Sequence, residues 1–243
     1  MSADMKLSII IPAFNEEKLL PGCLDSVRAA AAACGLSGYE TVVCDNASTD
    51  ATARIAREAG AQVACEPVRR ISRSRNAGAA AACGDWLLFI DADSQLSAAK
   101  LREMLDAIRS GRCAGGGSLI DFDSKPWWGA LTLALWTALS LALRWAAGSF
   151  VFCRADAFKE IGGFPPDMGA GEEVGLSRSL GSWGRRRGLG FIILTRTRHV
   201  SSGRKFRLYS PGEFLTMLLE IAKSPRRSLR DNTVLKPFYD GRR

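Results

Sequence analysis

The chain has 243 residues, with 33 lysines and arginines against 25 aspartates and glutamates, so its formal net charge is +8. A chain of this length can bury a large core and fits a single α/β domain. The composition excludes a disordered protein, and the positive charge indicates an anionic partner, either nucleotide phosphates or a phospholipid surface. Nucleic acid is not expected, because the basic residues show no zinc-finger spacing, helix-turn-helix pattern or basic sheet with interleaved aromatics.

The seven cysteines are scattered singly along the chain. Their total is odd and no Cys-x-x-Cys pair occurs, so a disulfide framework is not expected. Met1 to Lys6 is polar, and the apolar run Leu7 to Pro12 is too short for the core of a signal peptide. These features indicate a protein of the reducing cytoplasm.

Short apolar runs bounded by turn residues predict four strands in the first part of the chain. The first run is rich in β-branched residues and is expected to stop at its proline. The last consists of five apolar residues and is expected to be a central strand, buried on both faces. The predicted strands are Lys6 to Pro12, Tyr39 to Asp45, Gln62 to Cys65 and Trp86 to Ile90.

Helical segments separate these strands. Because helices connect successive strands, the sheet is expected to be mostly parallel, with right-handed crossovers and helices on both faces. The first helix has a proline in its first turn, and the third is rich in alanine. The expected helices run from about Pro21 to Ala33, from a cap at Ser48 or Thr49 to about Ala59, and from Ser72 to Cys83.

Acidic residues follow three of the predicted strands. Because ligands of a parallel sheet gather beyond the carboxyl ends of its strands, these acids are expected to converge. Neighbouring carboxylates repel one another unless a cation lies between them, and a divalent metal is the natural candidate. The alternative is a polar turn that leads to a helix capped by Ser97. The acids are Glu16 after the first strand, Asp45 at the end of the second, and Asp91 and Asp93 after the central one.

Five short motifs follow one another along the chain: Ser-Ile-Ile-Ile-Pro-Ala-Phe-Asn-Glu-Glu (8–17), Val-Val-Cys-Asp-Asn-Ala-Ser-Thr-Asp (42–50), Arg-Asn-Ala-Gly (75–78), Phe-Ile-Asp-Ala-Asp (89–93) and Gly-Gly-Phe-Pro (162–165). In this order and at these spacings they resemble family 2 glycosyltransferases, over roughly Leu7 to Arg207. The resemblance implies a single α/β, Rossmann-like domain of the GT-A type. It also implies a nucleotide-sugar donor, most often UDP-linked, and a Mg²⁺ or Mn²⁺ ion. Neither a Gly-x-Gly-x-x-Gly fingerprint nor a P-loop is present in the sequence.

The resemblance also assigns residues to the donor nucleoside. The loop after the first strand, with Pro12, Ala13 and Glu16, would surround the base and the ribose. Asp45 would accept the proton of the uracil imide, and Asp91 would approach the ribose. The residues alone leave open that Glu16 is simply an acid in the first turn of a helix.

Other residues are assigned by the same resemblance to the diphosphate and the metal. Arg75, with the helix that it opens, would face the diphosphate, and Asp93 would ligate the metal beside Asp91. His199, the only histidine, follows the apolar strand predicted from Leu189 to Leu194 and is a candidate further ligand. Arg204 lies in a basic segment, 201–207, similar to one that closes over the diphosphate in the family. From the residues alone, Arg75 could instead be a solvated helix arginine, His199 a polar contact and segment 201–207 a solvated loop.

A pair of glutamates marks the candidate catalytic site. A glycine-rich loop, Gly169 to Glu173, leads into a helix with Leu176 and Leu180 on one face. The family usually has Glu-Asp here, with the aspartate as general base for the acceptor hydroxyl. In this chain Glu173 takes that position, and Glu172 is the alternative base. Two glutamates could instead only interact with the helix N-terminus.

The segment Trp127 to Leu143 has 17 residues without a charge and is apolar on all sides when wound as a helix. Its length of about 26 Å is just short of a comfortable membrane span. It is either a buried core helix, a helix at a membrane interface or acceptor channel, or a transmembrane span. Together with the basic surface it suggests a hydrophobic, lipid-linked acceptor and peripheral contact with the inner face of the membrane. Before it, Ala114 to Ile120 is a predicted strand whose glycines indicate close approach to a ligand or a neighbour.

Together these inferences predict one domain over residues 1–243, with a nucleotide-sugar half (6–95), an acceptor half (96–207) and a C-terminal helix and basic tail (208–243). The expected reaction is metal-dependent hexosyl transfer to a hydroxyl acceptor, with inversion as the family habit. One alternative is another enzyme of the same fold, such as a nucleotidyltransferase. The other is a membrane-associated module that has lost catalysis.

Overall fold

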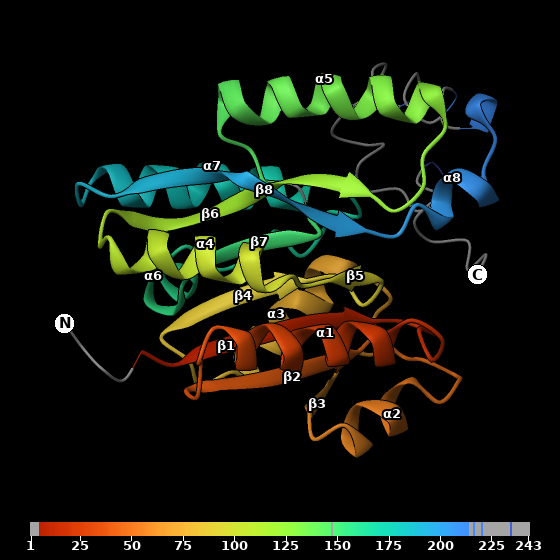
Figure 1. Cartoon of the computed structure of the whole chain (residues 1–243), viewed down its shortest axis with the longest axis horizontal. Helices are drawn as coiled ribbons and strands as arrows, with labels where there is room; N and C mark the ends of the chain where they lie inside the picture. Colours follow the sequence, from red (N-terminus) through yellow and green to blue (C-terminus); the bar gives the residue numbers. More distant parts are fainter. Residues whose placement is uncertain (1–4, 147, 214–215, 217–219, 221–233, 235–243) are drawn as a thin grey trace.

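The computed structural model describes residues 5–146, 148–213, 216, 220 and 234. Within these residues an eight-stranded sheet runs through the middle of the molecule (Figure 1). The strands are β1 (Leu7–Ala13), β2 (Tyr39–Asp45), β3 (Gln62–Cys65), β4 (Trp86–Ile90), β5 (Ser94–Gln95), β6 (Cys113–Phe122), β7 (Phe150–Arg154) and β8 (Gly190–Ser201).

The strand order across the sheet is β3-β2-β1-β4-β7-β6-β8-β5. The first four strands of this order are mutually parallel, as are β6 and β8, whereas β7 runs antiparallel to both of its neighbours and β5 to β8. The predicted, mostly parallel sheet is therefore confirmed. β1 continues one residue beyond Pro12, because β4 pairs with β1 only up to Ile10 and the missing N–H of the proline breaks no bond on that side.

Helices cover both faces of the sheet. Leu20, Leu24 and Leu101 belong to the core on one face, which is covered by α1, α2 and α4. Phe158 and Leu176 belong to the core on the other, which is covered by α3, α6 and α7. The helices are α1 (Leu20–Ala33), α2 (Thr52–Glu58), α3 (Ile71–Ala81), α4 (Ala98–Arg109), α5 (Trp127–Leu143), α6 (Ala155–Glu160), α7 (Glu172–Arg185) and α8 (Arg204–Leu208).

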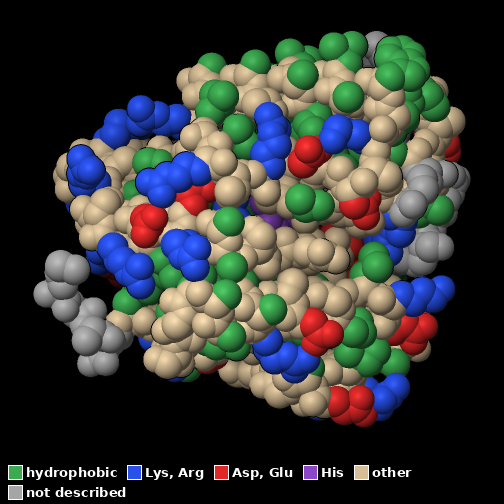
Figure 2. Space-filling model, in the orientation of Figure 1, with side chains coloured by type: hydrophobic (Ala, Val, Ile, Leu, Met, Phe, Trp, Pro, Cys, Tyr) green, Lys and Arg blue, Asp and Glu red, His purple; other side chains and the backbone are tan. Residues whose placement is uncertain are grey.

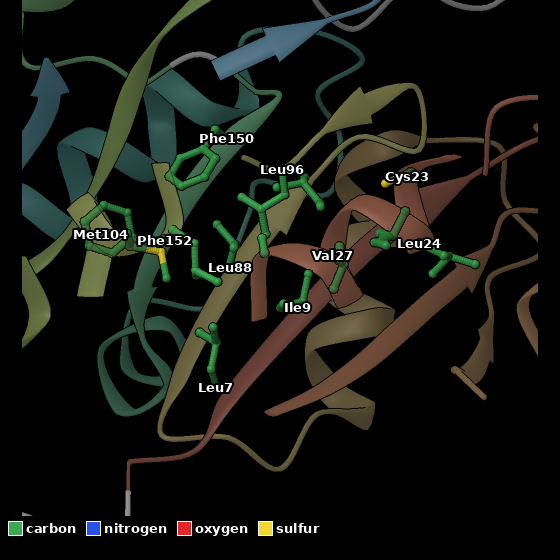
Figure 3. Close-up of a cluster of buried hydrophobic side chains, with 14 of the residues drawn as sticks. Leu7, Ile9, Cys23, Leu24, Val27, Leu88, Leu96, Met104, Phe150 and Phe152 are labelled. Carbon is green, nitrogen blue, oxygen red and sulfur yellow. The ribbon is translucent and has the colours of Figure 1, made fainter. Parts of the chain in front are cut away.

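The apolar strands divide their side chains between the two cores. Leu7 and Ile9 of β1 point into the cluster under α1 and α4, whereas Ile10 points to the opposite face. Figure 3 shows the first cluster, where Leu88 of β4 and Phe152 of β7 meet side chains from α1 and α4. Full burial of such a side chain contributes roughly 1.5–3 kcal/mol. The alternation therefore fixes the register of the strands whose ends carry the acidic residues.

The second helix begins later than predicted. We expected Ser48 or Thr49 to cap it, but α2 begins at Thr52. The carboxylate of Asp50 accepts hydrogen bonds from the backbone N–H of Thr52 at 3.0 Å and from its hydroxyl at 2.5 Å. The Ser48 hydroxyl instead accepts a bond from the Asn15 backbone N–H at 3.0 Å, so it ties the loop after β2 to the loop after β1. The predicted cap at Ser97 of α4 is confirmed, since its hydroxyl accepts from Lys100 N–H at 3.1 Å.

The glycines of β6 allow close approach of neighbouring protein. A Cβ atom on Gly116 would lie 2.4 Å from the backbone oxygen of Ile192 in β8. A Cβ atom on Gly117 would lie 2.4 Å from that of Ala146. Of the two explanations for these glycines, a nearby protein neighbour is therefore the one observed.

Helix α5 lies along one edge of the molecule, over β6 and away from the main core (Figure 1). Only Gly129, Leu133 and Ser140 of its residues are buried, so the first of the three alternatives, a core helix, was wrong. Trp127 is 81% exposed and Leu131 is 68% exposed. As for a membrane crossing, no helix in the described part of the chain combines the length and apolar character that it requires.

The predicted C-terminal helix is described only at its start. The side chain of Glu213 accepts from the backbone N–H of Ser210 at 2.8 Å, and the Ser210 hydroxyl accepts from Glu213 N–H at 3.3 Å. This reciprocal pair is the capping box of a helix N-terminus. The remainder of the predicted helix and basic tail, including 229–230 and 236–239, lies outside the described residues.

Candidate active site

The candidate site lies at the carboxyl ends of β1, β2 and β4, which we call the carboxyl rim. Asn15, with a left-handed backbone (φ 52°), turns the chain after β1. Its side-chain oxygen accepts from Thr49 N–H at 2.8 Å, and the N–H of Glu16 donates to the Thr52 hydroxyl at 2.8 Å. These bonds join the loops after β1 and β2, so the position of Glu16 is fixed by the backbone around it.

Asp91, at the end of β4, is paired with a buried arginine. The Arg75 side chain, 1% exposed, donates to Asp91 Oδ1 at 2.9 Å and to the carbonyl oxygen of Gly148 at 2.9 Å. Its other terminal nitrogen pairs with Glu172 Oε1. Burial alone would lower the pKa of Arg75, but the carboxylates of Asp91 and Glu172 raise it above its ordinary value. Arg75 is therefore a permanent cation that joins β4 to the first turn of α7.

This arrangement corrects the place expected for Arg75 in its helix. We predicted that Arg75 opens the helix, but α3 begins at Ile71. The guanidinium pairs with Asp91 and Glu172, and its expected role at the diphosphate stays a prediction. The hydroxyl of the preceding residue, Ser74, donates to the backbone oxygen of Cys44 at 3.3 Å, which holds α3 against β2. Arg75 thus joins Asp91 to Glu172.

Glu172 and Glu173 begin α7, after Gly171 in a left-handed conformation (φ 73°). Burial, followed by the charge of Glu173, raises the pKa of Glu172 to about 8, although Arg75 acts in the opposite direction. Three carboxylates surround one guanidinium here, because Glu173 also contributes to the field at Arg75. A proton is therefore retained readily in this cluster near neutral pH.

A second arginine lies across Glu16 and Asp93. Arg204 donates to the two carboxylate oxygens of Glu16 at 2.9 and 3.2 Å, and lies 3.7 Å from Asp93 Oδ2. The Ser201 hydroxyl donates to Asp93 Oδ1 at 3.4 Å. Burial would lower the pKa of Arg204, but Glu16 and Asp93 raise it. The cation required between neighbouring carboxylates is thus present here as a guanidinium.

The acids of the rim also share a buried neighbour, Cys23 of α1. Burial comes first, but the charges of Asp93, Asp91 and Glu16 all contribute to raising the pKa of its thiol. The thiol lies 3.6 Å from the backbone oxygen of Asp91. The structure therefore brings these three acids, from the ends of two strands, to one region.

Asp45 lies apart from both arginine clusters. It pairs in register with Ala13, and its Oδ1 accepts from Ser48 N–H at 3.2 Å. Pro12 is buried in the body of β1. Near this corner the guanidinium of Arg69 stacks on the ring of Phe14, 3.9 Å from its centroid. Sequence reasoning missed this stacking pair, although an aromatic residue after a strand and a distant arginine doublet are both visible in the chain.

His199 lies within β8, not in a loop after it, because the predicted strand ending at Leu194 continues to Ser201. Its ring is 1% exposed and packs 5.1 Å from that of Phe150. Burial lowers the pKa of His199 to about 4 and outweighs the opposing charge of Asp91. The imidazole is therefore neutral at pH 7, and neither nitrogen meets hydrogen-bond geometry with a described residue.

Among the described residues no group of three histidine, cysteine or acidic side chains is arranged as a metal cage. The donors nevertheless fit a hard cation that completes its shell from a substrate, because Mg²⁺ is commonly held by one or two carboxylates together with substrate phosphates. Asp93 already lies beside a cationic group, and the buried nitrogens of His199 have no partner among the described residues.

Comparison with known proteins identifies the family and the fold. The sequence profile of glycosyl transferase family 2 matches residues 8–168. An uncharacterized glycosyltransferase of Mycobacterium tuberculosis is 34% identical over 105 residues, which are 43% of this chain and 44% of that protein. The match thus covers less than half of the length of this relative.

Solved structures show the same fold at low sequence identity. The mannosyltransferase of Pyrobaculum calidifontis, in complex with GDP-Man and Mn²⁺, superposes with a TM-score of 0.66 at 18% identity, over 97% of this chain and 69% of that one. Glucosyl-3-phosphoglycerate synthase of Mycobacterium tuberculosis, in complex with Mn²⁺, UDP-glucose and phosphoglyceric acid, gives 0.62 at 21% identity, over 88% and 76%. The fold is the GT-A fold of these enzymes. The chain belongs to glycosyl transferase family 2.

Proposed function

We propose that this protein is a glycosyltransferase that moves a hexosyl group from a UDP-sugar to a hydroxyl acceptor in a metal-dependent, inverting reaction. The observation that carries the proposal is the convergence of acids at the carboxyl rim, where Arg204 joins Glu16 to Asp93 and Arg75 links Asp91 to Glu172. The acids of the carboxyl rim are suited to binding a cation and a nucleotide, and the acids that begin α7 are suited to proton transfer.

The donor nucleoside would bind along the loops after β1 and β2. Asp45 is partly exposed, has a free lone pair beyond its bond from Ser48 and can accept the imide proton of uracil. Pro12 and Ala13 supply the backbone wall beside it. The side chain of Asp91 is 28% exposed, so it can also reach a ribose hydroxyl while it remains paired with Arg75.

The diphosphate and its metal would lie over Asp93. Asp93 is the proposed carboxylate ligand, with Asp91 or neutral His199 as one further donor and substrate phosphates completing the shell, and Arg204 is the proposed counter-charge for the diphosphate. Mg²⁺ or Mn²⁺ bound there supplies positive charge that stabilises the departing nucleoside diphosphate. Arg204 begins α8 and is 18% exposed, so it can exchange Asp93 for a phosphate oxygen.

The proposed general base is Glu173, in the first turn of α7. It removes the proton of the acceptor hydroxyl while the oxygen forms a bond to the anomeric carbon, and the bond to the diphosphate breaks with its electron pair on the leaving UDP. Glu172 is buried and committed to Arg75, whereas Glu173 is only partly buried. The raised pKa of Glu172 supports a cluster in which a proton can be held near neutral pH.

The proposed acceptor is lipid-linked, and the protein works peripherally at the cytoplasmic face of a membrane. The exposed apolar helix α5 supports this part of the proposal, because a row of exposed leucines and a tryptophan is unusual on a protein that meets only water. The net charge of +8 favours binding to the anionic lipids of that membrane face.

The test is product analysis with a panel of UDP-sugars, with and without Mn²⁺, for the wild type and Glu173→Gln. We expect transfer or slow donor hydrolysis that requires the metal, and a loss of at least about 100-fold in turnover for Glu173→Gln with UDP affinity within about twofold. Glu58→Gln, on exposed α2, is the matched control. Retained turnover in Glu173→Gln would pass the role to Glu172 or refute it, and metal-dependent reaction with nucleoside triphosphates alone would indicate a nucleotidyltransferase.

A further inference from the structure

A basic cavity lies between the C-terminal end of α5 and the outer side of α7, away from the carboxyl rim. Its volume is ≈ 620 Å³. Among the described residues, no acidic side chain lines it. Its lining comprises Leu143, Arg144, Trp145, Gly175, Ser177, Arg178, Ser179, Gly181, Ser182, Arg185, Gly190 and Phe191.

One wall of this cavity, which we call the arginine pocket, is a single face of α7. Arg178, Ser182 and Arg185 follow one another at the spacing i, i+4, i+7, so they lie on the same side of the helix. Gly181 lies between the two arginines in the sequence, and Gly175 precedes them by about one turn. The long basic residues make a positively charged recess with room for a phosphate and the group attached to it.

The opposite wall is the turn that ends α5, and it is held by hydrogen bonds. Trp145 N–H donates to the oxygen of Ser140 at 3.2 Å, and the Ser140 hydroxyl donates to the oxygen of Trp145 at 2.7 Å. Ala146 N–H donates to the hydroxyl of Ser177 in α7 at 3.0 Å. These bonds fix Arg144, which ends α5 in a left-handed conformation (φ 54°), beside the arginines of α7.

The charges of the arginine pocket are not neutralised within the described part of the chain. Arg144, Arg178 and Arg185 form no ion pair there, in contrast to Arg75 and Arg204 at the carboxyl rim. Guanidinium groups bind phosphate oxygens through paired hydrogen bonds, and serine hydroxyls can add donors. The chemistry of the pocket is therefore that of a phosphate site.

The pocket is continuous with an apolar surface. We define the α5 ridge as the exposed apolar residues spaced by four along the helix. Because each step turns by about 40°, the row winds around the helix toward its last member, Leu143, which also lines the arginine pocket. Figure 2 shows hydrophobic side chains along the edge formed by α5 and lysine or arginine side chains below one end of it. The ridge consists of Trp127 (81% exposed), Leu131 (68%), Leu135 (64%), Leu139 (39%) and Leu143 (47%).

We propose that the arginine pocket binds the phosphate of an anionic phospholipid headgroup while the α5 ridge lies among the acyl chains of the same leaflet. An apolar helix in the interface beside a basic recess matches the two layers of a bilayer surface, hydrocarbon and phosphate. This inference rests on the proposed membrane contact and adds to it a specific headgroup site outside the donor site.

The experiment is flotation of the full chain with phosphatidylcholine vesicles, with and without about 30% phosphatidylglycerol. The pocket variant is Arg178→Gln/Arg185→Gln, and the control is Arg54→Gln/Arg57→Gln, which removes the same charge from exposed α2. At about one kcal/mol for each basic residue near an anionic surface, we expect the pocket variant to bind about 30-fold more weakly and the control to bind within about twofold of wild type. UDP affinity, measured in parallel, stays unchanged in both.

Several results would overturn the inference. Equal losses in the two double variants would mean that only net charge matters, and wild-type flotation of the pocket variant would remove the headgroup site. Binding to neutral vesicles alone, abolished by Leu131→Ser/Leu135→Ser, would leave a ridge without a phosphate site. If vesicles are ignored while pyrophosphate raises the melting temperature of the wild type but not of the pocket variant, the pocket takes a soluble phosphate. Failure of donor binding with normal flotation would count against the proposed function only.

Discussion

Replacing Arg75 by glutamine tests whether one buried guanidinium holds the two halves of the site together. Its terminal nitrogens bond to Asp91 at 2.9 Å, to the Gly148 oxygen at 2.9 Å and to Glu172. Glutamine is shorter and neutral, so it can replace neither pair. The variant leaves Asp91, Glu172 and Glu173 without the cation that they share.

The size of the effect follows from the surroundings of each partner. Removing one member of a buried ion pair typically costs about 3–5 kcal/mol. Asp91 can recover some hydration, since its side chain is 28% exposed, and Glu172 can take a proton, since its pKa is already raised to about 8. We therefore expect the lower end, about 3 kcal/mol, which corresponds to a fall of roughly 6–12 °C in Tm for a domain of this size.

The companion variant Glu172→Gln should cost less, about 1 kcal/mol or under, because Arg75 keeps Asp91 and glutamine, like the protonated Glu172, carries no charge. Thermal and urea unfolding of both single variants and the double variant measures the difference and the coupling. Arg28→Gln, in an exposed pair with Asp25, serves as control and should change stability by no more than about 1 kcal/mol. If Glu172→Gln proves as destabilising as Arg75→Gln, the account of three acids sharing one cation is wrong.

Three further predictions concern stability. Burial raises the pKa of Glu172 from 4.5 to about 8, so its contribution to stability is complete below about pH 4.5 and is lost as the pH rises through 8. Urea unfolding between pH 5 and 9 should show a free energy of unfolding that declines less steeply in Glu172→Gln than in the wild type. Identical slopes in the two proteins would contradict this. Leu133→Ala, at an 8% exposed position of α5, should cost about 2 kcal/mol and Leu131→Ala, 68% exposed, under about 0.5 kcal/mol; the reverse order in thermal unfolding would mean that α5 is turned the other way. Gly116→Ala would place a Cβ 2.4 Å from the Ile192 oxygen and should cost at least about 2 kcal/mol of stability. In Gly22→Ala the new Cβ meets nothing within 4 Å, so this variant should not destabilise α1. Equal melting temperatures of the two variants would refute the steric argument.

The strands and the acids at their ends could be predicted because their signals are local. The central strand Trp86–Ile90 is a run of apolar residues, and all five are buried. A carboxylate after such a strand must lie at the edge of the sheet, so the neighbourhood of Asp91 and Asp93 followed from topology alone. The element boundaries set by backbone turns were also visible, since Gly35 at the end of α1 has the left-handed φ of 60° that favours glycine.

The role of Arg75 could not be predicted in the same way. In the sequence it stands in a polar stretch that is typical of a solvated helix face, and its burial depends on Glu172, 97 residues later in the chain. Long-range pairing of this kind leaves no periodicity. The extension of β8 through His199 was missed for a related reason, because Thr195, Arg196 and Thr197 interrupt the apolar run while the backbone and hydroxyl donors of two of them bind Glu103 of α4.

The orientation of α5 was hidden by its uniform composition. A helix that is apolar on every side has no hydrophobic face to read, so the sequence allowed a core, an interface or a membrane span. The structure decides against the core because, in the described part of the chain, other helices already cover both faces of the sheet, and α5 packs against β6 and the ring of Phe206. A segment can therefore be hydrophobic enough for a protein interior and still lie at the surface, because other helices already cover the sheet.

The two arginines of the carboxyl rim differ in a way that separates structure from function. Arg75 is 1% exposed and bonded to three groups, so its removal must disturb the fold whether or not a ligand is bound. Arg204 follows β8, is 18% exposed and contacts Glu16 and Asp93. Replacement of Arg204 should therefore disturb the core less than replacement of Arg75. The two cations of the rim differ in burial, because Arg75 belongs to the interior whereas Arg204 lies closer to solvent.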